Sequence, residues 1–205
     1  MRIFNKIFQI GYSKTGTTSL FQALIELGIP TIHWWEEGWP EPKEVGFNQI
    51  NFEDRWNIHL KKGRNPINEL GYDKFYDAFT DRPFNRKKFI YKLPIYYPDS
   101  LFIYLERDMD TLWDSRVRWV EKIYPQNLDK MLNSFDEYPM RYNEDKVYHE
   151  EFLSTILSDN LLKMNICDDG DGWEKLCTFL DMDIPSRPFP HRRSFFTQFS
   201  VRFDT

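Results

Sequence analysis

Apolar residues in this chain form short unbroken runs, and between these runs they recur every three or four positions. Short apolar runs bounded by turn residues are typical of buried parallel strands, whereas the wider spacing is typical of amphipathic helices. The runs predict strands near residues 5–10, 29–33, 75–79, 101–106 and 161–166. The spaced pattern predicts helices near residues 17–28, 51–62, 84–94, 110–122, 143–158 and 171–181. This alternation predicts an α/β fold with three layers, in which a central, mostly parallel sheet of about five strands is flanked by helices.

Two segments interrupt this alternation. Residues 34–50 and 123–142 are rich in glycine or proline and carry no clear period. We expect both to be excursions over the carboxyl edge of the sheet. Loops above a rigid sheet usually carry specificity, so a lid or an acceptor pocket is expected there.

The length of 205 residues predicts a single domain spanning residues 1–205. No apolar run reaches the ~18 residues that a membrane helix needs, and the opening MRIFNKIFQIGY has no signal-peptide core. We therefore expect a cytoplasmic protein without a membrane span. The two cysteines are too few for a disulfide framework and lack metal-ligand spacing with any histidine, so no metal site is expected.

The formal net charge of −5 argues against nucleic acid as a partner, because it leaves no general basic field. Any binding of a highly charged anion must therefore depend on a local cluster of cations. The cations that the fold could gather are Lys14, Arg107, Arg116, Arg118, Arg192 and Arg193.

Residues 11–20 read GYSKTGTTSL and directly follow a short apolar run. A strand that turns through glycines into a helix aims several unpaired backbone N–H groups at one point, where an anion fits. The P-loop of nucleotide hydrolases, G-x-x-x-x-G-K-[ST], has its lysine after the second glycine. Here Thr17 occupies that place and Lys14 lies inside the loop. The pattern predicts an anion site without the usual lysine, and the alternative is an ordinary strand–turn–helix. The predicted ligands are Ser13, Lys14, Thr15, Gly16, Thr17, Thr18 and Ser19.

A second candidate segment reads LFIYLERDMDTLWDSRVRW, residues 101–119. Its first five residues read as a buried parallel strand, so Arg107 emerges at the carboxyl end, where ligands of open α/β sheets bind. Asp110 or Thr111 can cap the following helix, and Ser115 lies about one turn in. The alternatives are a surface ion pair for Arg107 and a solvated helix position for Ser115.

These two segments resemble the 5′-phosphosulfate loop and the 3′-phosphate segment of the sulfotransferases. In the first, Ser13 stands where proline is commoner; in the second, Arg107 and Ser115 keep the family's spacing and Met109 replaces a frequent proline. Residues 28–37, 80–99 and 161–190 also resemble the compact soluble sulfotransferase-like subgroup. The Arg-Lys-Gly-rich third segment of the steroid and phenol enzymes is missing, and the run His191-Arg192-Arg193 is the candidate substitute for it.

The resemblance implies transfer of a sulfuryl group from 3′-phosphoadenosine 5′-phosphosulfate (PAPS), used as co-substrate, to a hydroxyl or amine of an acceptor that the sequence does not identify. Lys14 would bridge the 5′-phosphate and the leaving oxygen, and no metal would be required. The hydroxyls of Thr17 and Thr18 would hold the phosphosulfate. Arg107 and Ser115 would grip the 3′-phosphate. The sequence gives no indication of the oligomeric state.

A base must take the proton of the acceptor. The candidates are His33 just after the second strand, Asp81 at the end of the third strand, and Glu36 or its neighbour Glu37. We rank His33 first, because its ordinary pKa suits the task near neutral pH, then Asp81 and then Glu36.

Two other classes of protein remain open. A P-loop kinase for a small molecule would share the architecture, although it would need lysine at position 17 and a strand-end aspartate for magnesium. A catalytically silent domain would keep the fold and bind a ligand or partner without reaction. Loss of Lys14, Arg107 or Ser115 would mark such a domain, and all three residues are present.

Overall fold

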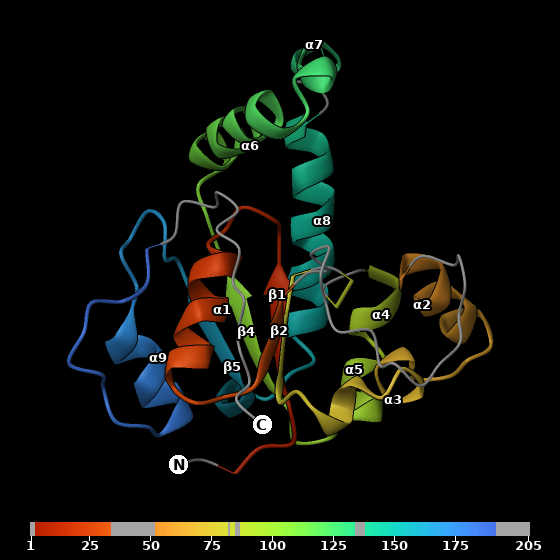
Figure 1. Cartoon of the computed structure of the whole chain (residues 1–205), viewed down its shortest axis with the longest axis vertical. Coiled ribbons are helices and arrows are strands. Elements are labelled where there is room, and N and C mark those ends of the chain that lie inside the picture. The colour runs from red at the N-terminus through yellow and green to blue at the C-terminus, as the bar shows by residue number, and fades with distance from the viewer. Residues whose placement is uncertain (1–2, 34–51, 82, 85–86, 134–137, 192–205) are drawn as a thin grey trace, which may run out of the picture.

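A computed structural model of the chain describes residues 3–33, 52–81, 83–84, 87–133 and 138–191. Its centre is a sheet of five parallel strands in the order β2-β3-β1-β4-β5 (Figure 1). The strands are β1 (Ile7–Gly11), β2 (Thr31–His33), β3 (Ala78–Thr80), β4 (Leu101–Leu105) and β5 (Leu161–Met164). The predicted α/β class and the five-stranded parallel sheet are confirmed.

Every position of β1 and of β4 is buried, because helices cover both faces of the sheet at its centre. Side chains of successive strand residues point to opposite faces. In β4, Leu101 and Ile103 join the core on one face, and Phe102 joins the core on the other. The unbroken apolar runs in the sequence are therefore the signature of a central strand.

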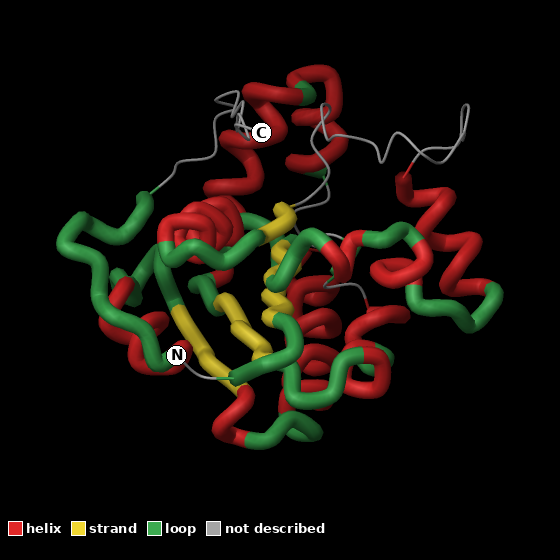
Figure 2. Tube along the Cα trace, turned by 60° about the horizontal axis from the view of Figure 1, so that its bottom comes forward, coloured by secondary structure: helices red, strands yellow, loops and turns green. Residues whose placement is uncertain are grey.

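The helices that flank the sheet divide between these two cores, as Figures 1 and 2 show. On one face lie α1 (Thr17–Glu26) and α9 (Trp173–Leu180). On the other face lie α2 (Phe52–Lys61), α3 (Pro66–Glu69), α4 (Lys87–Ile90), α5 (Leu93–Tyr96) and α8 (Tyr138–Leu153). The second core is strongly aromatic, and Phe8 of β1 stacks on Phe79 and on Phe102 with ring centroids 5.3 and 6.0 Å apart.

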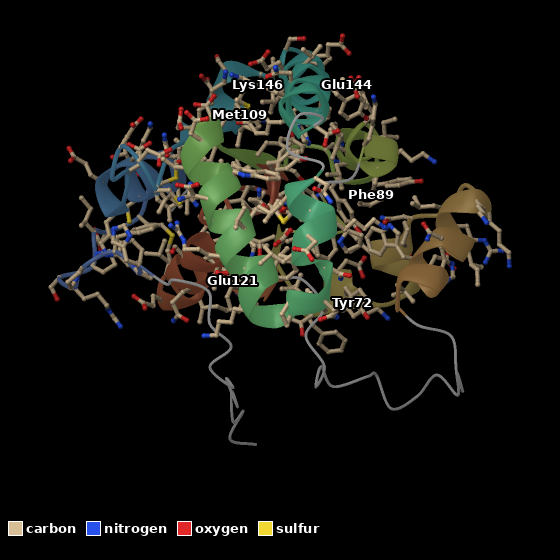
Figure 3. The ribbon with its side chains drawn as sticks, turned by 90° about the horizontal axis from the view of Figure 1, so that it is seen from above. Tyr72, Phe89, Met109, Glu121, Glu144 and Lys146 are labelled. Atoms are coloured by element: carbon tan, nitrogen blue, oxygen red, sulfur yellow. The ribbon has the colours of Figure 1, made fainter. Side chains whose placement is uncertain are left out.

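Above the carboxyl edge of the sheet stand α6 (Met109–Ile123), α7 (Leu128–Leu132) and the first half of α8. Figure 3, viewed from above, shows α6 running from Met109 to Glu121 beside α8. A small apolar cluster built on Leu112 and Trp113 of α6 includes Tyr12 from the loop after β1 and Tyr142 from α8. This cluster fixes the upper helices against the segment that follows β1.

The structure departs from the predicted elements in the connections. The helix predicted over residues 84–94 is two short helices, because Pro94, in the first turn of α5, has no N–H to continue the preceding turn. Residues 123–142, predicted as a loop, contain the 3₁₀ turn η2 (Pro125–Asn127), α7 and the first residues of α8. The helix predicted over residues 143–158 ends at Leu153. Three short turns without a clear period were not predicted: α3, η1 (Tyr72–Lys74) and η4 (Ser158–Asn160).

Among the described residues, no helix combines the length and the apolar character that crossing a bilayer requires. The longest of the described helices, α8, has 16 residues and carries charged residues in both halves.

Gly11, the last residue of β1, has φ +117°, and a Cβ added there would lie 2.7 Å from the carbonyl oxygen of Leu105. Gly63 also has positive φ, +69°, but nothing lies within 4 Å of its added Cβ. We expect Gly63→Ala to lower the free energy of unfolding by about 1–2 kcal/mol, the strain of a left-handed residue. Gly11→Ala should cost roughly 2–5 kcal/mol, because a backbone clash adds to that strain. Equilibrium denaturation in urea measures both, and equal losses would contradict the close approach of β4 at Gly11.

Candidate functional site

The segment between β1 and α1 forms an open cradle at the carboxyl edge of the sheet. Lys14 and Gly16 both adopt the left-handed conformation, with φ of 71° and 97°. Gly16 is the N-cap residue of α1, and its position offers no side chain to the first-turn amides. Backbone turns of this kind in front of a helix N-terminus concentrate N–H groups and the positive end of the helix dipole. The geometry is that of an anion site.

The threonines of the cradle have different roles. Thr15 is buried, and its hydroxyl donates to the carbonyl oxygen of Tyr12 over 2.7 Å, so it closes the turn. The Thr17 hydroxyl donates to Oδ2 of Asp81 over 3.3 Å. The Thr18 hydroxyl lies 3.3 Å from Nε2 of His33. Of the predicted ligands, Thr15 therefore serves the backbone of the loop, and the other two threonines face titratable groups.

Lys14 carries a cation that has no carboxylate or carbonyl partner among the described residues. Its ammonium lies 4.3 Å from the centre of the Trp119 ring, which stabilises a cation through the ring quadrupole. Burial lowers the pKa of Lys14 to about 8; the charge of Asp81 opposes this shift and that of Arg116 adds to it. Near neutral pH the group is charged, desolvated and able to bind an anion.

His33 ends β2 and lies beside Thr80, its register partner on β3. Its Nδ1 is 2.9 Å from the Thr80 hydroxyl, and Phe21 of α1 stacks on the ring with centroids 5.2 Å apart. Burial lowers the pKa of His33; Asp81 opposes this shift and Lys14 adds to it. The imidazole is therefore neutral at physiological pH, the state that can accept a proton.

Asp81 follows β3 directly and is 94% buried, since only 6% of its surface is exposed. Its backbone is left-handed, with φ 63°, and its amide donates to Oε1 of Gln9 over 2.7 Å. The Gln9 side chain, fully buried on β1, in turn donates to the carbonyl oxygen of Ile10 over 2.8 Å. A fixed carboxylate thus stands close enough to Lys14 and His33 to influence both.

Arg107 follows β4 and connects the cradle to the upper helices. Its Nη1 donates to the Lys14 carbonyl oxygen over 2.7 Å, and its Nε donates to the Thr111 hydroxyl over 3.1 Å. Its Nη2 has no hydrogen-bond partner among the described residues. The sequence offered a surface ion pair with Asp108 or Asp110 as the alternative. The ion pair observed is instead with Asp168, at 3.9 Å.

The N-cap of α6 is Asp108, not Asp110 or Thr111 as predicted. Its Oδ1 accepts hydrogen bonds from the amides of both predicted residues, over 2.9 and 3.2 Å. The cap lies earlier because the helix already begins at Met109, one residue before the predicted start, so its second and third amides are those of Asp110 and Thr111.

Ser115 lies on α6 nearly two turns from its start, deeper than the one turn predicted, and is partly exposed. Thr111, Ser115 and Trp119 are spaced by four residues, so they share one face of the helix. The first of them contacts Arg107 and the last contacts Lys14. The face that carries Ser115 is therefore the one turned toward the cradle and Arg107.

Asp168, in the loop after β5, is a site residue that the sequence did not indicate. Its carboxylate accepts from the Asp108 amide over 2.7 Å and from the Thr111 hydroxyl over 2.9 Å, besides its ion pair with Arg107. Its position after a strand at the same sheet edge is the one signal that could have found it.

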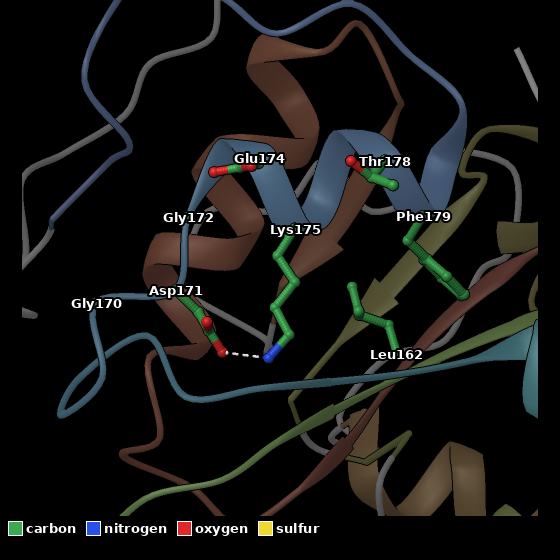
Figure 4. A pocket seen from close by; sticks show the side chains of 8 residues that line it. All are labelled: Leu162, Gly170, Asp171, Gly172, Glu174, Lys175, Thr178 and Phe179. Carbon is green, nitrogen blue, oxygen red and sulfur yellow. Dashed lines mark hydrogen bonds and ion pairs between the residues drawn. The ribbon is translucent and has the colours of Figure 1, made fainter.

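The loop that carries Asp168 is held in place by contacts of Asp171 with the end of β5 and with α9. The Asn165 amide donates to Oδ2 of Asp171 over 2.7 Å, and Lys175 of α9 binds the same carboxylate at 2.8 Å. This pair lies in a pocket on α9 and β5 (Figure 4), lined by Leu162, Gly170, Asp171, Gly172, Glu174, Lys175, Thr178 and Phe179. The pocket contains none of the predicted site residues, and its central charged groups bind each other.

For the remaining predicted site residues, the structure gives the burial and the position alone, or does not describe them. Ser13 is partly exposed within the turn of the cradle, and Ser19 is buried in the first turn of α1. Glu36, with its neighbour Glu37, and the basic pair Arg192 and Arg193 lie outside the described residues. Within the described ranges, no group of three or more His, Cys, Asp and Glu side chains is arranged to hold a metal ion.

The arrangement can bind an anion at the cradle, supply a second cation from Arg107 beside it, and accept a proton at His33. The model of a family described as "Sulfotransferase domain" matches residues 6–154 and 145–194 of this chain, a span that includes all three groups. A relative from Aspergillus versicolor, Ava biosynthesis cluster protein M, is 22% identical over 222 aligned positions, which cover 91% of this chain and 80% of that protein. The match confirms the resemblance seen in the sequence, and the chain belongs to the sulfotransferase domain family.

Proposed function

We propose that the chain is a sulfotransferase that uses PAPS and delivers the sulfuryl group to a hydroxyl or amine. The observation that carries the proposal is the Lys14 ammonium, which is desolvated, lies at the anion cradle and forms no ion pair with any described residue. A family model that covers most of the chain supports the reaction class.

The cradle suits the 5′-phosphosulfate of the donor. The negative group would lie against the N-terminus of α1, where backbone amides and the helix dipole attract it, and the Thr18 hydroxyl can donate to it. Lys14 would leave the face of Trp119 and bind the oxygen that bridges phosphorus and sulfur. Coulomb attraction near a surface, about 4 kcal/mol at ~4 Å before desolvation, is ample to drive this movement.

Arg107 and Ser115 would bind the 3′-phosphate. Nη2 of Arg107, which has no hydrogen-bond partner in the described part of the chain, provides donors, while Thr111 and the Lys14 carbonyl hold the rest of the guanidinium in place. Ser115 lies on the same face of α6 as Thr111, and its hydroxyl would be a further donor to the 3′-phosphate. Recognition of this second phosphate would distinguish PAPS from ATP.

In the transfer step, the acceptor oxygen or nitrogen forms a bond to sulfur while the bond from sulfur to the bridging oxygen breaks. The electron pair of the broken bond remains on the 5′-phosphate, where Lys14 stabilises it. The acceptor proton passes to His33, whose pKa burial lowers so that the imidazole is neutral before transfer. The fixed charge of Asp81 stabilises the imidazolium that results, so we assign Asp81 to charge support and His33 to proton transfer.

A P-loop kinase is the second candidate, because one observation favours it. Asp81 lies at a strand end and accepts a hydrogen bond from Thr17 at the cradle, and in nucleotide hydrolases such an aspartate holds Mg²⁺ together with the P-loop hydroxyl, whose position here is that of Thr18. Against it, position 17 is threonine where those proteins need lysine.

Calorimetric titration with adenosine 3′,5′-bisphosphate, and with ATP in the presence and absence of Mg²⁺, tests the proposal without knowledge of the acceptor. We expect tight binding of the bisphosphate that does not depend on Mg²⁺. Preference for magnesium–ATP would favour the kinase, and failure to bind either would favour a catalytically silent domain.

The same titration tests the role of Arg107. Arg107→Ala should weaken adenosine 3′,5′-bisphosphate about 10- to 100-fold, as expected for loss of charge-assisted hydrogen bonds, and should weaken adenosine 5′-phosphate much less. Arg64→Ala, which removes an exposed arginine between α2 and α3, controls for net charge and should change neither. Equal weakening of both nucleotides by Arg107→Ala would remove the 3′-phosphate assignment.

The lowered pKa of Lys14 gives the binding a defined pH dependence. In the free protein Lys14 loses its proton as the pH rises through about 8, whereas bound phosphate holds that proton on. Affinity for the bisphosphate should therefore show no loss due to Lys14 up to about pH 7 and should fall by up to tenfold per pH unit above 8. In Lys14→Met binding should be weaker and flat between pH 7 and 9.5, as measured by calorimetry. A slope that survives in Lys14→Met would show that another group is responsible.

A further inference from the structure

The hydroxyl of buried Thr80, on β3, links the side chain of His33 to the backbone of β2, the strand that His33 ends. β2 and β3 run parallel with His33 opposite Thr80 and Ile32 opposite Phe79, so the two polar side chains meet on one face of the sheet. Thr80 has no exposed surface. Its hydroxyl makes two hydrogen bonds, one with the Ile32 carbonyl oxygen and one with Nδ1 of His33.

The directions of these two bonds follow from the hydrogens available. A carbonyl oxygen only accepts, so the single hydrogen of the Thr80 hydroxyl is donated to Ile32, over 3.0 Å. The bond of 2.9 Å to His33 then needs a hydrogen from the imidazole. A neutral imidazole has one N–H, and it must be on Nδ1.

The other ring nitrogen is consequently the basic one. With the hydrogen on Nδ1, Nε2 carries the lone pair and lies 3.3 Å from the Thr18 hydroxyl, on the first turn of α1. This nitrogen faces the cradle, whereas Nδ1 faces the sheet. The ring cannot exchange these roles without breaking the bond to Thr80, and Phe21 stacks against its face.

We propose that Thr80 is a positioning residue that holds His33 as the Nδ1–H tautomer and so makes Nε2 the atom that takes the proton from the acceptor. The assignment of a catalytic purpose rests on the proposed function, but the tautomer does not. During transfer the acceptor proton moves to Nε2, the other hydrogen stays on Nδ1 and remains donated to the Thr80 hydroxyl, and the imidazolium formed is stabilised by Asp81. Lys14 disfavours that imidazolium until the donor's negative charge is bound beside it.

Three variants separate tautomer control from general stability. Thr80→Val keeps the shape and removes the acceptor, so the hydrogen of the imidazole is no longer held on Nδ1. Thr80→Ser restores the hydroxyl. Thr31→Val is the matched control, because the Thr31 hydroxyl is also buried on this part of the sheet and donates to a carbonyl, that of Ile29 over 2.8 Å, without contacting His33.

The tautomer is read by long-range ¹H–¹⁵N correlation spectra of the full chain, with the His33 signals assigned by their loss in His33→Gln. In the unsubstituted protein and in Thr80→Ser we expect Nδ1 to show the shift of a protonated nitrogen and Nε2 that of a bare one. In Thr80→Val the two shifts should move toward each other or exchange. Thr31→Val should leave them unchanged.

Turnover gives the second measurement once an acceptor is known. We expect kcat to fall at least tenfold in Thr80→Val, with KM for PAPS unchanged, and to recover in Thr80→Ser. A bare Nδ1 in the unsubstituted protein would overturn the proposal even if Thr80→Val fails to fold. The proposed function fails separately, through absence of bisphosphate binding, so the two results are distinguishable.

Discussion

The parallel pairing of β1 between β3 and β4 is the constraint on which the rest of the site depends. It brings three chain segments that are far apart in the sequence to one edge, so that the cradle after Gly11, Asp81 and Arg107 emerge side by side. Two hydrogen bonds then lock the three segments together. Gln9 of β1 holds the amide of Asp81, and Arg107 holds the carbonyl oxygen of Lys14. The cradle is therefore fixed from both neighbouring strands before any ligand binds, and preorganisation of this kind lowers the cost of binding.

The electrostatics of the site follow from the buried carboxylate of Asp81, which lies among groups that burial would neutralise. Desolvation lowers the pKa of both Lys14 and His33, and the carboxylate of Asp81 opposes the shift in each. The outcome differs because the starting pKa values differ. Lys14, at about 8, remains mainly charged near neutral pH, whereas the imidazole becomes more firmly neutral. One environment thus produces a cation and a neutral imidazole, the separation of roles that the proposed transfer needs at the leaving oxygen and at the acceptor.

The sequence predicted the features that depend on local pattern. The five strands, the cradle and the emergence of Arg107 all follow from apolar runs and from residues at fixed short spacing. It did not predict that Thr80, Asp168 and Trp119 belong to the site. Each of them reaches the site only through the register of two strands or through the packing of a helix over a loop. Short helices such as α3 were not predicted either, because four residues are too few to show a helical period. Asp108 was not predicted as the cap because α6 begins at Met109, one residue before the start that the spaced pattern indicates.

The position of the lysine determines which chemistry this architecture can support. In a P-loop hydrolase the lysine begins the helix and reaches the phosphates from there; here that place belongs to Thr17, whose hydroxyl turns away to Asp81. The cation comes instead from inside the loop, on a left-handed residue whose carbonyl is bound by Arg107. Its ammonium is held on the far side by an aromatic ring of α6, the same helix whose inner face carries Ser115. In the proposed function, the helix that would bind the 3′-phosphate therefore also sets the resting position of the lysine that would act at the 5′ end.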